Sequence, residues 1–135
     1  MTVPSMFTDS TSPLYNAKLN STNMPPTAID LGLTGATDDL QKVVNNLKIM
    51  YSEMVHSVNI VEDFIGKPYL ERSATDPGPG SSERGSHVAV QVFVGDPKQP
   101  TFEDMGNFYS AGRDLLFYCH HANVDRMWTL WRELK

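Results

Sequence analysis

The sequence predicts a mainly α-helical fold with long irregular loops. Two segments carry apolar residues at helical spacing: residues 38–66, and the stretch from about residue 110 to the C-terminus. A third apolar segment, residues 87–96, is short and ambiguous. The remaining stretches are rich in Ser, Thr, Asn, Pro and Gly and show no sustained periodicity, which is typical of loops.

Composition limits the classes of function. The chain has 135 residues, within the size of one domain, and a net charge of −5, which gives no support to a nucleic-acid partner. Its longest apolar run is far too short to span a bilayer. The first residues lack the basic and apolar regions of a signal peptide, so we expect no targeting segment.

Residues 1–37 are predicted to form a loop segment, because they are dominated by turn-forming residues. So long a loop is unusual in a compact domain. We therefore expect it to wrap around an element that this chain does not contain.

Residues 38–66 are predicted to be helical. Thr37 or Asp38 provides an N-cap, and Gly66, followed by Lys and Pro, ends the segment. The pattern allows one break near Ser57, and His56 is expected on the flank of the helix. The apolar stripe consists of Leu40, Val43, Val44, Leu47, Met50, Met54, Val58 and Val61.

Residues 87–96 read as a strand by propensity, since their valines are β-branched and alternate. The segment is also short enough to be a buried helix. His87 and Gln91 lie four residues apart. On a helix these two side chains are one turn apart, whereas on a strand they are about 13 Å apart. Only a helix would let both reach one metal ion.

The C-terminal helix contains the adjacent pair His120 and His121. Neighbouring helical residues point about 100° apart, so only one of the two can face a given metal ion. Asp125, one turn after His121, could orient its ring by accepting a hydrogen bond. The expected apolar face, which includes one histidine, consists of Leu116, Phe117, His120, Val124, Met127, Leu130, Trp131 and Leu134.

The single cysteine, Cys119, is expected to be a small buried residue of this helix. A thiol–imidazole pair with His120 is the alternative, although adjacent helical side chains seldom face each other. Trp128 and Trp131 are expected to be core or docking residues.

Several longer motifs of the sequence resemble those of a known family. "EDMGNFYSAGRDLLFYCHHANVDRMWTLW" closely resembles the second copper-binding region of plant polyphenol oxidases, the catechol oxidase and tyrosinase family with type-3 copper sites. Upstream, "PPTAIDL", "NNLKIMYSEMV", "FIGKPY" and "DPGPGSSERGSH" resemble the segment between the two copper regions of that family. The resemblance covers nearly all of residues 1–135.

The resemblance implies a fold and a ligand set. It implies a partial four-helix bundle in which residues 87–135 carry the second copper site. The metal ligands would be His87, the residue at position 91 and His121, with His120 and Asp125 as supporting neighbours. Position 91 holds Gln where the family has His, which predicts weaker copper binding, because an amide oxygen is a poorer donor than imidazole.

The resemblance also implies two catalytic positions. Glu83 matches an acidic residue that holds a water near the coppers, and Phe108 matches an aromatic residue that forms a gate over the second copper. The parent enzyme would oxidise o-diphenols to o-quinones with dioxygen at two coppers. It would be located in the thylakoid lumen of plastids.

The sequence itself accounts for only part of that enzyme. The three histidines expected for the first copper are absent from it, and the C-terminal helix has no cap. We therefore interpret the chain as a fragment that is inactive or nearly so by itself, with the first-copper half as its missing partner. The apolar faces of its helices should be exposed.

Two other classes of function remain open. One is a non-catalytic or dioxygen-binding type-3 copper protein, which would have the same ligands beneath a closed cover. The other is a mononuclear metal hydrolase, which would need a third good ligand and an open position on zinc.

Overall fold

The computed structural model describes residues 2–55, 59–68 and 78–135, and the described part is helical. Its main elements are α1 (Asp39–Met54), α2 (Val61–Ile65), α3 (Val88–Val94) and α4 (Leu115–Leu134). A π-helical turn, η3 (Glu83–His87), leads directly into α3. Within these residues the only β-type pairing is an isolated bridge between Leu19 and Gly95. The predicted mainly α fold is therefore confirmed.

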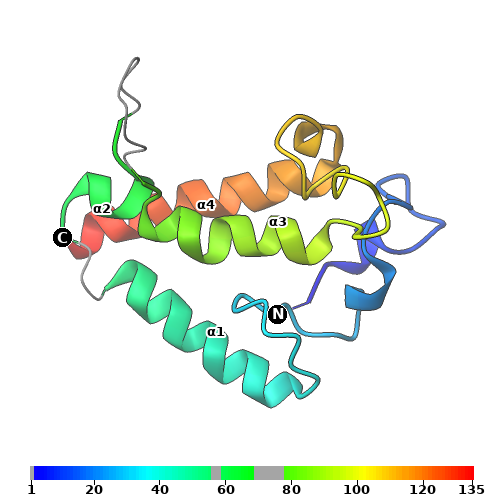
Figure 1. The fold of residues 1–135 in the computed structure, drawn as a ribbon, viewed down its shortest axis with the longest axis horizontal. Coiled ribbons are helices and arrows are strands. Elements are labelled where there is room, and N and C mark those ends of the chain that lie inside the picture. Colours follow the sequence, from blue (N-terminus) through cyan, green and yellow to red (C-terminus); the bar gives the residue numbers. More distant parts are fainter. Residues whose placement is uncertain (1, 56–58, 69–77) are drawn as a thin grey trace.

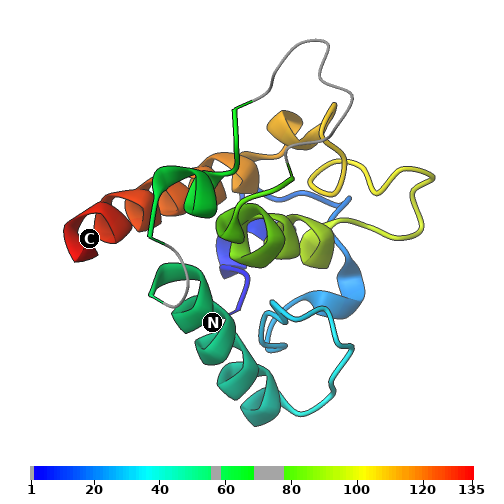
Figure 2. The same cartoon turned by 60° about the vertical axis from the view of Figure 1, so that its left-hand side comes forward.

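Helices α3 and α4 lie side by side and run in opposite directions, while α1 crosses below them at a steep angle (Figure 1). The turned view shows α1 approaching the pair only at its C-terminal end (Figure 2). That end meets η3, so η3 is where the three helices come together.

The predicted helix 38–66 is interrupted. The α1 helix ends at Met54, and α2 begins at Val61 after an extended residue, Ile60. The expected break near Ser57 falls in this interval, although Ser57 itself and His56 lie outside the described residues. Gly66 ends α2 with a φ of 94°, a left-handed conformation that favours glycine, so the predicted stop is confirmed.

The Val-rich segment 87–96 is a helix, not a strand. Its propensity is overridden by packing: Ala89, Phe93 and Val94 are buried, and Ala89 and Phe93 lie one turn apart on the same face. The helical alternative, in which positions 87 and 91 are one turn apart, is confirmed.

Residues 1–37 are mostly loop, as predicted, with two short 3-10 turns, η1 (Ser5–Phe7) and η2 (Ser21–Asn23). They pack on elements of their own chain. The backbone N–H of Asn20 donates to the Val94 carbonyl (2.8 Å), and the side-chain Nδ2 of Asn23 donates to the Phe93 carbonyl (2.7 Å). Both bonds use carbonyl groups at the C-terminal end of α3, which lack partners inside that helix.

Two apolar clusters form the core. The first lies where the N-terminal segment meets the end of α3 and the start of α4, and contains Val3, Phe7, Leu19, Ile29, Phe93, Val94, Met105 and Leu116. The second contains Phe64, Met127 and Trp131, with Met50, Met54 and Trp128 packed against it. The second cluster confirms the expected core role of the two tryptophans.

Much of the apolar surface of the helices is not covered. On α1, Leu40 is 78% exposed and Leu47 is 67% exposed, as the sequence led us to expect. On α4 the predicted stripe is correct for Leu116, His120, Met127 and Trp131, which are buried. Leu130 and Leu134 of the same stripe are exposed, in line with the expectation that apolar faces of the helices are left uncovered.

The expectation of a buried Cys119 is wrong, because its thiol is on the exposed side of α4. No helix of the described residues has the length and apolar character needed to cross a membrane.

Candidate metal centre

Three side chains predicted as ligands meet between α3 and α4. His87 ends η3, Gln91 lies one turn later on α3, and His121 comes from the facing turn of α4. Because the two helices are antiparallel, the start of α3 lies beside residues 120 and 121 of α4. The sequence order alone would not have placed them together.

Their terminal atoms form a nearly equilateral triangle. The Nε2 atoms of His87 and His121 are 3.3 Å apart, and the Gln91 Nε2 atom is 3.3 Å from each of them. The centre of such a triangle lies at 3.3/√3, or about 1.9 Å, from every corner. Bonds from zinc to imidazole nitrogen measure about 2.0–2.1 Å, so the space between the three side chains would fit an ion of this size.

Position 91 is the weak corner of the triangle. An amide nitrogen carries two hydrogens and cannot coordinate a metal, but it can donate to the two imidazole nitrogens. A half-turn of the amide group exchanges nitrogen and oxygen and brings Oε1, a possible ligand, to the same place. Gln91 is only 5% exposed, so its amide has no competing contact with bulk water. The residues therefore fit one metal ion, held by two strong donors and one weak donor.

The described residues hold no cluster of three or more His, Cys, Asp or Glu side chains able to bind a metal. This follows directly from Gln91, since the site has only two residues of those types.

The two adjacent histidines have different environments. His120 is 8% exposed, and its Nε2 atom lies 2.8 Å from the backbone oxygen of His87, to which it donates. His121 instead points its Nε2 atom to His87 and Gln91. His120 thus holds the backbone that carries His87, while His121 presents a nitrogen to the centre.

All three imidazoles favour the neutral form. Burial lowers the pKa of His120 to about 4. Burial also lowers the pKa of His87, with a further contribution from His121, and Glu83 opposes this shift. Burial lowers the pKa of His121 as well. Neutral imidazole is the form that binds metal ions, so the nitrogens at the centre are available near pH 7.

The remaining predicted residues lie on η3, in the loop before α4 and on α4. Glu83 is on η3, one turn before His87, and its Oε2 atom accepts a hydrogen bond from the Gly80 amide (3.0 Å). Phe108 is in the loop between α3 and α4 and is 81% exposed, and no ring contact among the described residues joins it to the histidines. Asp125 is exposed on α4, and its carboxylate makes no hydrogen bond to His121 in the described part of the chain. The roles of these three residues stay predictions.

The alternative thiol–imidazole pair does not form. Cys119 is exposed, while the His120 ring is buried and bonded to the His87 oxygen. The geometry therefore gives no nucleophilic dyad at this position.

Sequence reasoning missed two features of the site. The Phe117 ring lies against the His121 ring, with centroids 3.9 Å apart, and so fixes the plane of that imidazole. Their spacing of one helical turn was a signal that could have been used. The second is Glu53, a buried acidic residue in the last turn of α1.

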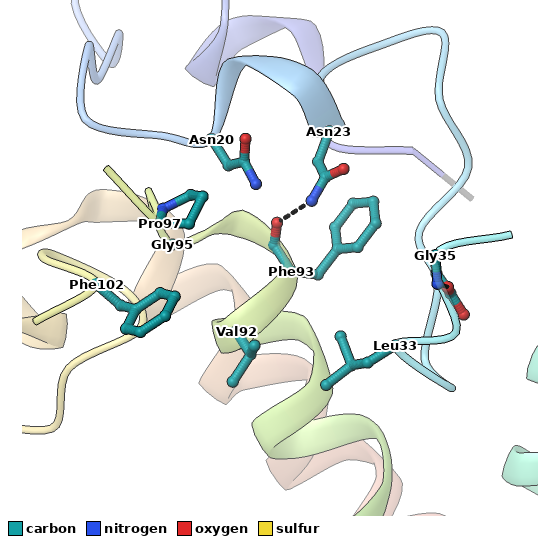
Figure 3. A pocket seen from close by; sticks show the side chains of 10 residues that line it. Asn20, Asn23, Leu33, Gly35, Val92, Phe93, Gly95, Pro97 and Phe102 are labelled. Carbon is teal, nitrogen blue, oxygen red and sulfur yellow. Dashed lines mark hydrogen bonds between the residues drawn. The ribbon is translucent and has the colours of Figure 1, made fainter. Parts of the chain in front are cut away.

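The structure also contains a surface pocket of about 260 Å³ at the other end of α3. Figure 3 shows Val92 and Phe93 on one side of it and Asn20 and Asn23 above, with the bond from Asn23 to the Phe93 carbonyl. None of the predicted ligands lines this pocket, so it is separate from the candidate metal centre.

Comparison with known proteins identifies the family. The family model described as the common central domain of tyrosinase matches residues 1–134. A chloroplastic polyphenol oxidase of Malus domestica is 47% identical over 137 aligned residues, which cover 99% of this chain and 23% of that protein. Polyphenol oxidase II of Ipomoea batatas, also chloroplastic, is 46% identical and is covered over 24% of its length.

The fold is similar as well. The solved structure of latent apple tyrosinase superposes with a TM-score of 0.88 at 46% identity, covering 100% of this chain and 30% of that one. The chain thus spans about a quarter of the length of the curated relatives it matches. Because the model of the common central domain of tyrosinase matches nearly every residue, the chain belongs to the tyrosinase family.

Proposed function

We propose that this chain is the second-copper part of a plant polyphenol oxidase, a copper-dependent oxidoreductase that converts o-diphenols to o-quinones with dioxygen. The observation that carries the proposal is the meeting of His87, Gln91 and His121 at 3.3 Å between two antiparallel helices. Imidazole suits copper, and copper is the metal that membership of the tyrosinase family implies.

Each residue has a stated role in the proposal. His87 and His121 hold the metal through Nε2, and Gln91 contributes its amide oxygen as a weak third donor. His120 keeps the His87 backbone in place through its hydrogen bond to the carbonyl. When bound, a pair of coppers supplies the exchange of two electrons between dioxygen and the diphenol.

The other residues act on the substrate and on water. Phe108, an exposed aromatic residue of the loop before α4, provides a flat apolar face for a phenol ring. Glu83 lies near enough to His87 to oppose the lowering of its pKa, and in this proposal its carboxylate holds a water beside the metal. The diphenol gives up two electrons and two protons as it becomes the quinone.

The ligands of a second metal would come from elsewhere in a longer protein. The sequence has only four histidines, and three of them are already placed at this centre. We infer that the first-copper half packs on the exposed apolar residues of α1, such as Leu40 and Leu47. Without that half, the chain should show little or no diphenol oxidation.

The same proposal includes a location in plastids, because the relatives from Malus domestica and Ipomoea batatas are named chloroplastic. Within the plastid we place the parent enzyme in the thylakoid lumen, as its family resemblance implies.

Copper titration tests the ligand assignment. The 135-residue chain should bind about one equivalent of copper, and the double variant His87→Ala with His121→Ala should lose that binding. Replacing the exposed Cys119 by Ala is a control that should leave it intact. Unchanged copper binding in the double variant would show that the assigned ligands are wrong.

A further inference from the structure

Glu53 is an acidic residue in a place where acidic residues are rare. It lies in the last turn of α1 and is only 2% exposed. Acidic side chains are almost never buried to this degree unless they are paired or hydrogen-bonded. Its partners therefore indicate what the residue is for.

Both carboxylate oxygens of Glu53 bind one residue of η3. Oε2 accepts the backbone N–H of Ser86 at 3.1 Å, and Oε1 accepts the Ser86 hydroxyl at 2.8 Å. Ser86 immediately precedes the proposed ligand His87. Glu53 of α1 therefore holds the chain at the residue before that ligand.

The chain makes room for this carboxylate. A Cβ atom on Gly85 would lie 2.7 Å from Glu53 Oε2, closer than van der Waals contact allows. Gly85 also has non-helical backbone angles, φ −101° and ψ −125°, at the point where η3 is distorted. The irregular turn before His87 is thus shaped around the Glu53 side chain.

On its other side, the same backbone is held by α4. His120 donates to the His87 carbonyl at 2.8 Å, and the Ser86 hydroxyl lies 3.8 Å from the sulfur of Met127. The backbone of residues 86 and 87 is therefore fixed between α1 and α4. Since His121 is also on α4, this fixing sets where His87 stands relative to His121.

We propose that Glu53 is a positioning residue of the metal centre, holding His87 opposite His121 through its two hydrogen bonds to Ser86. The inference rests on the proposed function, because it requires His87 and His121 to be the ligands. Groups that orient ligands from outside typically change metal affinity 10- to 100-fold when they are removed.

A merely structural role would be to attach α1 to the rest of the fold. Asn46 offers a matched control on the same helix. Its Nδ2 atom donates to the Ile29 carbonyl (2.7 Å), and its Oδ1 atom accepts from the Leu31 amide (2.9 Å). These two bonds tie α1 to the N-terminal segment and do not involve η3.

The experiment measures copper(II) affinity, by competition with a chelator, and the copper(II) EPR spectrum of the full 135-residue chain. Glu53→Ala should weaken binding by about 10- to 100-fold and change the EPR parameters. Glu53→Gln, which keeps the shape and one acceptor oxygen, should retain more affinity than Glu53→Ala. Asn46→Ala should lower the melting temperature but leave the affinity within about twofold.

If Glu53→Ala does not fold, Ser86→Ala decides the matter. It removes one of the two bonds to Glu53 and should weaken binding at least about threefold, the effect of one net hydrogen bond. Wild-type affinity and EPR spectrum in Ser86→Ala, or in a folded Glu53→Ala, would overturn the proposal. So would an equal loss of affinity in Asn46→Ala.

The double variant of His87 and His121 separates the two possible failures. If it still binds copper as the wild type does, the ligand assignment itself is wrong. If it loses copper while Glu53→Ala keeps full affinity, the assignment stands and only the role of Glu53 is refuted.

Discussion

His120 donates a hydrogen bond from Nε2 to the backbone oxygen of His87, across 2.8 Å between α4 and η3. The histidine that is adjacent to a proposed ligand thus holds the backbone of the other one. This bond joins two elements 33 residues apart in sequence and is made by a ring that is largely removed from water.

The bond predicts how the stability of the metal-free chain depends on pH. Burial lowers the pKa of His120 from 6.5 to about 4, so the folded state binds a proton less readily than the unfolded state. Its contribution is then complete above pH 6.5 and is lost as the pH falls towards 4. We expect the free energy of unfolding to decrease by on the order of 2–3 kcal/mol over this range. Urea unfolding in the presence of EDTA would measure it.

His120→Gln is the control for this pH effect, because the amide keeps a donor for the His87 oxygen but does not titrate. The variant should lose less stability than the wild type between pH 6.5 and 4. Some dependence will remain, since the pKa values of His87 and His121 are also lowered. An equally steep decrease in the variant would show that His120 is not responsible.

Replacing Gln91 by His should strengthen copper binding. An imidazole nitrogen at the third corner of the triangle is a better donor than an amide oxygen, so we expect affinity to rise at least about tenfold. EPR should then show three coordinating nitrogens in place of two. Gln91→Ala, which removes the amide, should bind copper more weakly than the wild type. No gain in Gln91→His would mean that position 91 does not face the metal.

Asp114 should be important for the attachment of α4. It is 2% exposed. As the N-cap of α4 it accepts a hydrogen bond from the backbone N–H of Leu116 (2.8 Å), and it accepts a second one from Asn16 Nδ2 (2.9 Å). Asp114→Ala should cost about 1–3 kcal/mol by thermal or urea unfolding, because it removes a cap and leaves buried donors unpaired. Asp114→Asn keeps an acceptor oxygen for the cap and should cost less. Asp38→Ala, at the exposed cap of α1, is expected to cost about 1 kcal/mol or less; a larger loss there than at Asp114 would contradict this ranking.

Two phenylalanines test the difference between core and surface. Phe64 is fully buried, with its ring centroid 5.2 Å from that of Trp131 and 5.8 Å from that of Trp128. Phe64→Ala should therefore destabilise the chain by about 3–5 kcal/mol. The same change at Phe108, which is 81% exposed, should alter stability by less than about 0.5 kcal/mol. A large loss at Phe108 would show that its ring is packed.

The histidines could be identified from the sequence because their residue types carry the chemistry. His87 and position 91 have the spacing of one helical turn, and the sequence motif around His120 and His121 is long enough to indicate the family. The weakness of the site was also predictable, since Gln91 is a residue identity and not a matter of geometry. The helix stop at Gly66 followed from its conformational freedom.

Other features depended on contacts that a linear pattern does not contain. The valines of residues 88–94 favour a strand by local propensity, but packing of α3 on its neighbours makes the segment helical. Cys119 lies beside a buried histidine and is nevertheless exposed, because adjacent helical residues point in different directions.

By itself, the sequence determined the family and the mainly helical character of this protein, and it named the candidate ligands. Only the tertiary structure decided that His87, Gln91 and His121 meet at 3.3 Å, that His120 holds His87, and that Glu53 is buried against Ser86. The physical reason is that ligand chemistry belongs to individual residues, whereas distances between α1, α3 and α4 arise from packing between segments far apart in the chain.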